Sequence, residues 1–506
     1  MFVLKTRDGV LDSGDRGQLE RLREALSIPG KKVHLHLHGG LIDQAAGIEI
    51  AKKLADKTTG IALDGWERVF VVWRTGAIET LKINWTEIFE NDRLYRILLR
   101  RLLKFMADRI GQNDTTGRTL GVGLGLTNDE IRSRLDSKGQ GNPFADIDEI
   151  SFAGTPSGRS ISTASDEGVI GTDFKAALKA DSTFQEIVTD ITSALTRSPV
   201  TGRSALATGN ATDGARVLKN LNRRVVKELK KEVPAEEGAR ALFSSAAILF
   251  YLLDHGKNIA VKVFMRFKLG RHHGLYATII EEIVRELYGD LIGSSVWGMM
   301  KQDAADHFAP GRLGGELMNL LEESRPETVL VTAHSAGSIW ATEMLDYLEE
   351  MSLTVRVKLV FLAPAVRADR FGPVISKTSG FIDDFRMFTM PDHLERKDPV
   401  LGADFGYLYP SSLLYLVSGL FEDRDADAFV DAPILGMARF LAADFPNFSD
   451  QRDVSAASAV KSFLDRPNHL VLAMENSNPG FKCKALSHGG FDDDPDTLAS
   501  IADFVR

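Results

Sequence analysis

The sequence predicts an α/β protein with a doubly wound, mostly parallel sheet and a large, mainly helical insertion. Short apolar runs rich in β-branched residues recur along the chain, and several are followed by a glycine-containing turn and an amphipathic helical pattern. Such an alternation is typical of a parallel sheet covered by helices. The runs fall into two groups separated by about 250 residues, far more than one strand-helix-strand unit requires. This gap predicts the insertion.

Six runs are expected to be strands, and the segments after them indicate helices. Apolar residues recur at helical spacing at 46–54, after the first run, and at 339–351, after the third. A last helix is expected at 496–505. The strands are expected at 32–37, 68–73, 328–333, 357–362, 385–390 and 469–474.

The spacing of these elements predicts how the chain is divided. Residues 1–76 and 311–506 are expected to form the sheet and its helices, and 77–310 the insertion. Within the insertion, 115–165 is rich in glycine, serine and aspartate, which is typical of a flexible loop. The rest reads as helix, including the apolar run 241–253. A smaller insertion at 404–466 is a candidate lid, although its apolar stretch is equally consistent with a buried helix.

Composition and charge exclude several classes of partner. The chain has 506 residues and a formal net charge of -9, so we expect no nucleic acid partner. The single cysteine, Cys483, rules out an internal disulfide and favours a reducing compartment. Asp8, Asp12 and Asp15 interrupt the N-terminal segment where a secretory signal needs an apolar stretch, and the run 241–253 is too short to span a bilayer. We therefore expect a cytoplasmic protein without a transmembrane segment.

A serine stands between the third expected strand and its helix. In the segment ETVLVTAHSAGSIWATEML, Ser335 has small residues two positions before it, Ala333, and two positions after it, Gly337. A nucleophilic serine on a sharp strand-to-helix turn requires small neighbours, because the turn packs tightly against the adjoining strand and helix. The turn would also aim the main-chain N–H of Ala336 at a developing oxyanion. Ser335 is therefore the predicted nucleophile.

Three further segments complete a catalytic arrangement. His38-Gly39-Gly40-Leu41 follows the first strand and resembles the oxyanion-hole loop of α/β-hydrolase lipases and esterases, with an N–H of Gly40 or Leu41 as the second donor. His488 follows the last strand and is the expected general base. The loop after the fifth strand, PDHLERKDPVLG, supplies the acid. We choose Asp398 from its Asp-Pro-Val setting, and Glu395 remains the alternative.

The order of these four elements resembles the α/β-hydrolase superfamily over residues 30–76 and 311–506. The resemblance implies a serine hydrolase that cleaves a carboxylic ester, with no cofactor and with a small-molecule or lipid-like substrate. Two departures are evident. Ala333 replaces the glycine that many members have, and the long insertion comes earlier than caps usually do in this superfamily.

Two other functions stay open at this point. His34, His36 and His38 alternate along the first strand and share one face, and metal-dependent hydrolases also use H-x-H spacings for the first ligands of their metal sites. His272 and His273 are further candidate ligands. A non-catalytic protein of the hydrolase fold that only binds partners is the third hypothesis.

Overall fold

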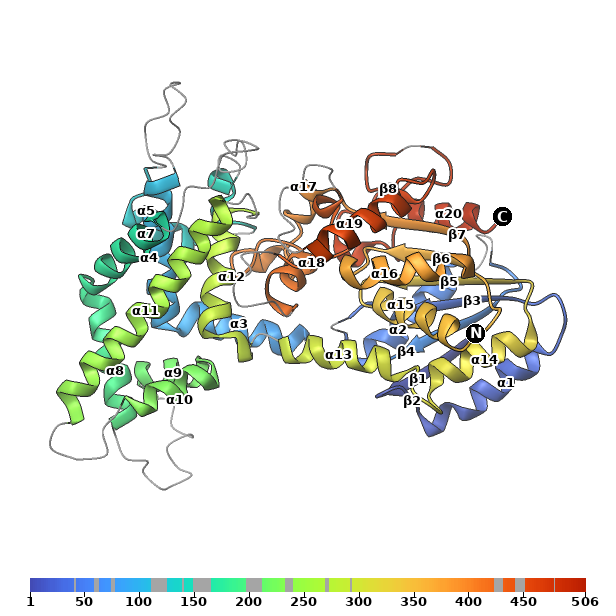
Figure 1. Ribbon diagram of the computed structural model, residues 1–506, viewed down its shortest axis with the longest axis horizontal. Coiled ribbons are helices and arrows are strands. Elements are labelled where there is room, and N and C mark those ends of the chain that lie inside the picture. The colour runs from blue at the N-terminus through green and yellow to red at the C-terminus, as the bar shows by residue number, and fades with distance from the viewer. Residues whose placement is uncertain are drawn as a thin grey trace.

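The structure is a computed structural model in which helices and sheet form two adjoining parts (Figure 1). One part holds the sheet, the covering helices and both ends of the chain, and the other is a bundle of helices. The structure describes residues 1–40, 42–58, 63–73, 78–110, 125–138, 141–148, 165–196, 212–232, 240–268, 273–291, 294–422, 431–441, 451–476 and 478–506.

One eight-stranded sheet has the order β2-β1-β4-β3-β5-β6-β7-β8, and every strand is parallel to its neighbours except β2, which is antiparallel to β1. The expected α/β class and mostly parallel sheet are confirmed, and all six expected strands are present. The strands are β1 (Phe2–Arg7), β2 (Val10–Leu11), β3 (Lys32–Leu37), β4 (Glu67–Val72), β5 (Thr328–His334), β6 (Val357–Leu362), β7 (Ile382–Thr389) and β8 (Leu470–Leu472).

The strands β1 and β2 were not expected. The segment FVLKTR mixes apolar and charged residues and is short, so its pattern alone does not identify a strand. Its parallel pairing with β4 determines its conformation, and Leu4 is fully buried as a result. A parallel pair needs a long crossover connection, which here runs through residues 12–66 and includes β3.

Helices cover both faces of the sheet because side chains alternate along each strand. On one face, α1 (Arg16–Leu26), α14 (Leu313–Ser324), α15 (Gly337–Glu350), α16 (Ala368–Thr378) and α19 (Gln451–Leu464) pack side by side. Leu37 of β3 contacts this layer at Gly337. On the other face, α2 (Gln44–Thr58) and α20 (Pro495–Phe504) join Phe70 of β4 in a small apolar cluster.

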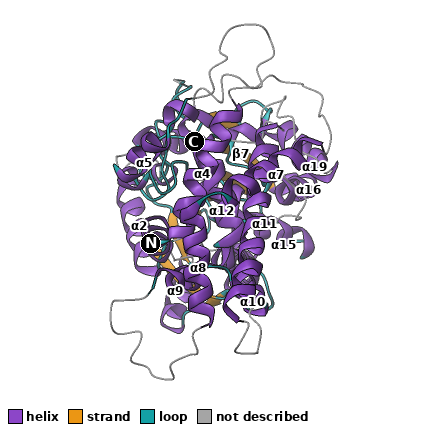
Figure 2. Cartoon of the chain, turned by 90° about the vertical axis from the view of Figure 1, so that its left-hand side faces the viewer, coloured by secondary structure: helices purple, strands orange, loops and turns teal. Residues whose placement is uncertain are grey.

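The described residues between β4 and β5 form helices, as Figure 2 shows from the side of the bundle. Much of 115–165 lies outside the described residues, but 128–136 within it is helical, not loop. None of the helices in the described ranges has the length and hydropathy needed to cross a membrane. The helices are α3 (Ile78–Asn91), α4 (Arg93–Ile110), α5 (Asn128–Asp136), α7 (Ser165–Lys179), α8 (Ser182–Thr196), α9 (Asp213–Asn220), α10 (Arg223–Lys231), α11 (Arg240–Lys268), α12 (Leu275–Leu287) and α13 (Ser294–Asp306).

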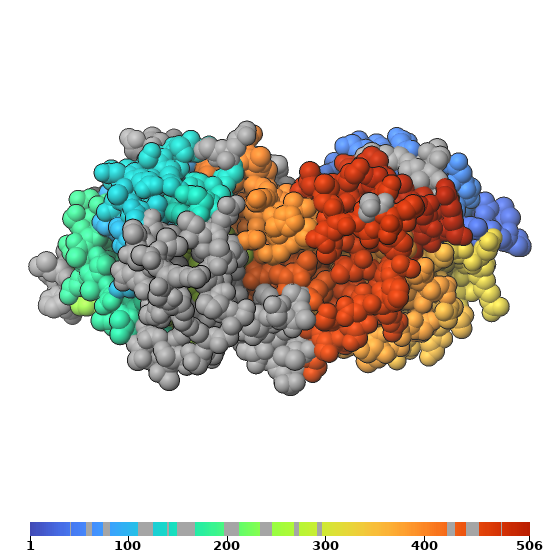
Figure 3. All heavy atoms as spheres, turned by 90° about the horizontal axis from the view of Figure 1, so that it is seen from above, coloured from blue at the N-terminus to red at the C-terminus, as the bar shows by residue number. Residues whose placement is uncertain are grey.

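The segment after β7 joins the two parts. Seen from above, residues near position 400 lie between the C-terminal region and the helical part (Figure 3). Tyr407 donates a hydrogen bond to Glu90 of α3 at 3.0 Å, and Tyr409 packs edge-on against Trp85 with ring centroids 5.4 Å apart. Because these aromatic side chains are buried in the junction, the apolar stretch of the candidate lid forms core between the two parts.

Short helices complete this junction and the connecting loops. They are α17 (Asp392–Glu395), α18 (Leu413–Leu416), a π-helix at Val417–Phe421, and single turns of 3₁₀ helix at Ser13–Asp15, Gly289–Leu291, Ser379–Phe381, Ala403–Phe405, Ala438–Phe440 and His488–Gly490. Two of them hold candidate site residues: α17 ends with Glu395, and the last 3₁₀ turn begins with His488. The loops after β7 and β8 thus supply the acids and the histidine.

Candidate active site

Ser335 occupies a strained turn between β5 and α15. Its φ is 51°, in the left-handed region, which costs a non-glycine residue of order 1 kcal/mol. The surrounding structure holds this conformation: the Ser335 N–H donates to Leu362 O at 2.8 Å, and the Ser335 carbonyl accepts from Ala365 N at 3.0 Å. A Cβ atom on Gly337 would lie 2.5 Å from Leu37 O, so only glycine fits where β3 meets the turn.

His488 is in contact with the serine hydroxyl. Its Nε2 lies 2.8 Å from Ser335 Oγ, and both residues are buried. Burial holds the pKa of His488 well below its usual value, and the neighbouring His334 lowers it further. The imidazole is therefore neutral and accepts the hydroxyl proton at Nε2, which leaves the ring proton on Nδ1. That Nδ1 has no hydrogen-bond partner among the described residues.

Asp398 contacts the main chain of His488. Its Oδ2 accepts the His488 N–H at 2.6 Å, so the expected acid lies beside the expected base, but at its backbone and not at its ring. Burial raises the pKa of Asp398, whereas the bond from the His488 N–H opposes that rise. At neutral pH this hydrogen bond is best made by a carboxylate.

Glu395, the alternative acid, is buried at the end of α17. Burial raises its pKa well above the usual value; the Ser412 side chain lowers it, and the nearby Asp398 and Asp392 carboxylates raise it. Among the described residues Glu395 makes no hydrogen bond to His488. A neutral carboxyl in this position has no charge with which to stabilise an imidazolium.

The glycine loop after β3 lies against the serine turn. A Cβ atom on Gly39 would be 3.2 Å from Ser335 Cβ, and one on Gly40 would be 3.0 Å from Ala336 Cβ. The absence of side chains therefore lets the loop backbone approach the turn closely. Met300 of α13 covers Gly40 from the other side. Leu41, the other candidate donor, lies outside the described residues.

A cavity of about 400 Å³ opens onto these groups. One wall is apolar and comes from α2 and from the loop after β7. Charged side chains, among them Lys53 and Asp493, lie at the exposed rim. Its lining comprises Gly39, Gly40, Ile42, Ile50, Lys53, Leu54, His334, Ser335, Asp398, Pro399, Val400, Leu413, His488, Gly489, Asp492 and Asp493.

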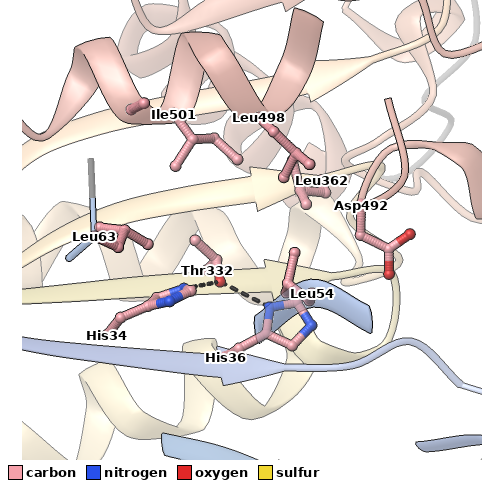
Figure 4. Close-up of a pocket in the computed structure, with 10 residues that line it drawn as sticks. His34, His36, Leu54, Leu63, Thr332, Leu362, Asp492, Leu498 and Ile501 are labelled. Carbon is pink, nitrogen blue, oxygen red and sulfur yellow. Dashed lines mark hydrogen bonds between the residues drawn. The ribbon is translucent and has the colours of Figure 1, made fainter. Parts of the chain in front are cut away.

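His34 and His36 lie outside this cavity, on the face of β3 under α20 (Figure 4). The Thr332 hydroxyl is 2.8 Å from His34 Nε2 and 2.8 Å from His36 Nδ1, so it donates to one ring and accepts from the other. Burial lowers the pKa of His34 to about 3, with a smaller contribution from Arg68, and lowers that of His36 well below its usual value. Both rings are therefore neutral core side chains with a shared hydroxyl partner.

His38 and His273 do not share a site, and each has its own contacts. His38 Nδ1 donates to Gly39 O at 2.7 Å, and its Nε2 accepts the Trp73 N–H at 3.3 Å. His273 lies at the junction with its Nε2 2.9 Å from Glu281 Oε1, and His272 lies outside the described residues. Across the described part of the chain, no group of three or more His, Cys, Asp or Glu side chains is placed to hold a metal ion.

Sequence patterns did not point to two residues of the site. His334 precedes Ser335 in the same motif, and its Nε2 lies 2.8 Å from the His488 carbonyl oxygen. Asp492 lies 3.7 Å from the other nitrogen of that ring. The position of His334 next to Ser335, the predicted nucleophile, is a signal that could have marked it, whereas Asp492 is one of three consecutive aspartates. Cys483 is buried and stays a packing residue.

The site therefore brings together a hydroxyl, a neutral imidazole that can take its proton, and a glycine loop at one cavity. This set of groups suits nucleophilic attack on a carbonyl carbon. Comparison of the chain with family models, with curated proteins and with solved structures finds no match in any of the three. Its function must be inferred from the geometry of the site.

Proposed function

We propose that the protein is a serine hydrolase of the α/β-hydrolase type that cleaves a carboxylic ester through an acyl-enzyme on Ser335. The contact of 2.8 Å between His488 Nε2 and Ser335 Oγ carries this proposal, because it joins a base to a nucleophile that is held in a strained strand-to-helix turn. The contact opens onto the cavity of about 400 Å³, where a substrate carbonyl can reach it.

The arrangement of the loops supports the same function. The serine follows β5, the acid loop follows β7, the histidine follows β8, and the glycine loop follows β3. In α/β-hydrolases the nucleophile turn, the loop after the third strand and the chain order serine, acid, histidine have this relation. Because β3, β5, β6 and β7 are parallel neighbours, the loops after them meet at one edge of the sheet.

The reaction proceeds in two halves. In the first, Ser335 Oγ attacks the ester carbon while His488 Nε2 takes the hydroxyl proton, and the main-chain N–H groups of Ala336 and Gly40 stabilise the oxyanion. His488 then gives that proton to the leaving alcohol as the carbon–oxygen bond breaks. In the second half, water attacks the acyl-enzyme with the same proton transfers and releases the acid. Asp398 holds His488 in position and offsets the imidazolium charge.

The cavity favours a small-molecule or lipid-like ester. A volume of about 400 Å³ lies within the range of ordinary small-molecule sites. Ile42, Ile50, Val400 and Leu413 provide an apolar wall that suits an acyl chain or a hydrophobic alcohol. The charged rim suits a polar group that stays near solvent. We therefore propose esters with an acyl chain of moderate length as the substrate class.

Labelling with a fluorophosphonate probe tests the proposal, because the probe reacts only with an activated serine. The protein should be labelled, Ser335→Ala should not, and the control Ser376→Ala, a change in α16, should be labelled like the parent. A panel of p-nitrophenyl esters of increasing chain length then defines the substrate. A folded parent protein without labelling or turnover would contradict the proposal and favour an interaction protein, and turnover that a chelator abolishes would favour a metal-dependent hydrolase.

A further inference from the structure

We propose that His334 and Asp398 together position the base by hydrogen bonds to the main chain of His488, a pair of contacts that we call the backbone clamp. The clamp orients the base, a role that a carboxylate bonded to Nδ1 has in other triads. The inference rests on the proposed function and names a positioning residue for that reaction. Its basis is the pair of contacts that hold the His488 peptide groups from two sides.

The two contacts are complementary. Asp398 Oδ2 accepts the His488 N–H at 2.6 Å, and His334 Nε2 lies 2.8 Å from the His488 carbonyl oxygen. A carbonyl oxygen only accepts, so Nε2 of His334 carries the proton in this contact. The main-chain donor of His488 is therefore bonded to a side chain from the loop after β7, and its acceptor to a side chain from the end of β5.

The ring of His488 needs such support. Its Nδ1 has no hydrogen-bond partner among the described residues, so no side chain fixes its orientation from behind. His488 also begins a single 3₁₀ turn, and residues 481–486 before it have no regular structure. A short turn after an irregular segment has few backbone bonds of its own to hold it. Other bonds hold the segment on either side of His488, such as the one from Lys484 N–H to Asp494 Oδ2 at 2.8 Å, and the two side-chain contacts hold the main chain of His488 itself.

His334 is well placed to set this position. It is the last residue of β5 and adjoins Ser335, so its main chain is part of the same rigid strand end as the nucleophile. The Gly39 backbone packs against its ring, since a Cβ atom there would lie 3.4 Å from His334 Nδ1. The bond from His334 to His488 therefore sets the distance between Ser335 and the main chain of His488, because no flexible segment separates His334 from Ser335.

Asp492 closes the clamp. Its Oδ2 lies 3.7 Å from His334 Nδ1, beyond hydrogen-bond length but close enough to attract a charged imidazole. Asp492 follows His488 by four positions in the same loop, so this contact is a second point at which that loop approaches the end of β5. Asp492 is buried, which reduces the screening of this attraction by water.

The clamp also affects proton transfer. Among the described residues that line the cavity with His488, the charged and titratable groups are His334 on β5, Asp398 in the loop after β7, Asp492 and Asp493 after β8, and Lys53 on α2. Of these, His334 contributes to the lowered pKa of His488, after burial. Loss of His334 should raise that pKa toward its usual value. A protonated base is inactive, so the acid limb of the pH profile should then move to higher pH.

Two replacements of His334 separate orientation from charge. His334→Phe keeps a flat ring and removes the donor, and we expect kcat to fall about tenfold or more with KM unchanged within about threefold, as for a lost buried hydrogen bond. His334→Gln restores an N–H of similar reach, and we expect kcat within about threefold of the parent. Both should show the acid limb at higher pH, because both remove the contribution of His334 to the lowered pKa of His488.

The measurements are ester turnover as a function of pH and the rate of fluorophosphonate labelling, with the fold checked by circular dichroism. His393→Gln, at an exposed histidine in the acid loop, is the matched control and should behave like the parent. Full activity with an unshifted profile in folded His334→Phe would overturn the clamp, as would a defect of equal size in His334→Gln. A parent that is neither labelled nor active would instead refute the proposed function.

Discussion

Asp398 and His488, 90 positions apart, meet through the histidine main chain, with Oδ2 of the aspartate 2.6 Å from the histidine N–H. The ring of His488 is turned to the other side, where Nε2 faces Ser335 Oγ. His488 is thus held by its backbone, and its side chain is free to act as the proposed base. This division of roles leads to distinct expectations for the acid, the base and the scaffold around them.

The identity of the acid can be tested by comparing Asp398 with Glu395. We expect Asp398→Ala to lower kcat/KM by about a hundredfold or more, since the His488 N–H loses its partner and the imidazolium loses the nearby charge. Glu395→Gln should stay within about threefold of the parent, because a buried neutral carboxyl and an amide are similar in size and charge. Steady-state kinetics with the best p-nitrophenyl ester measures both, and the reverse ranking would assign the acid to Glu395.

The pH profile should reflect the lowered pKa of His488. Catalysis needs the neutral ring, and burial followed by His334 lowers the pKa well below the usual 6.5. As pH falls through 6.5 the base therefore stays deprotonated, and kcat/KM should begin to fall only at more acidic pH. Initial rates across the range, with circular dichroism to confirm that the protein stays folded, measure this. An acid limb centred at or above 6.5 would show that the base is not in this buried environment.

Gly337 should be essential to the packing of the serine turn. In Gly337→Ala the new Cβ would lie 2.5 Å from Leu37 O and 2.9 Å from Leu37 Cβ, so β3 and α15 must move apart. We expect a loss of about 2 kcal/mol or more in the free energy of unfolding, together with loss of labelling at Ser335. Gly298→Ala in α13 meets open space and should be neutral or slightly stabilising. Urea unfolding compares the two, and equal stability would refute this account of the turn.

Arg266 should stabilise the junction between the helical part and the segment after β7. Its guanidinium contacts Glu281 at 2.7 Å, Glu282 at 3.1 Å and Asp431 at 2.8 Å, and all four side chains are buried. Arg266→Met would remove the one cation that contacts all three carboxylates and leave them only their separate contacts with His273, Arg285 and Arg439, so we expect a loss of about 3–5 kcal/mol in the free energy of unfolding.

The control for this change is Arg23→Met, which removes an exposed ion pair with Glu323. Exposed pairs contribute about 1 kcal/mol or less, so this variant should unfold like the parent. Denaturant unfolding followed by tryptophan fluorescence measures both variants. A small effect of Arg266→Met would mean that apolar packing alone holds the junction.

Local patterns accounted for the elements nearest the chemistry. The six expected strands are apolar runs bounded by turn residues, and the strand-to-helix turn at Ser335 requires small neighbours whatever the rest of the chain does. The same approach missed β1, because six residues of mixed polarity are identified as strand only by their partner β4. It also left His34, His36 and His38 together as a candidate metal site, although His38 bonds to backbone and the other two share Thr332.

Which residues touch was decided by the path of the chain. The amino-acid order alone predicts Ser335 as the nucleophile and the loops that would hold its partners, because strand-to-helix turns and strand ends are set by neighbours a few positions away. The contact of His488 with Ser335 spans 153 positions, and the bond from His334 to the His488 carbonyl spans 154. Such contacts depend on how two loops are brought to one edge of the sheet and on hydrogen-bond lengths of a few ångströms, which no local pattern encodes. The sequence predicted an acid beside the ring of His488. Only the tertiary structure shows that the Asp398 carboxylate bonds to the backbone of His488 instead.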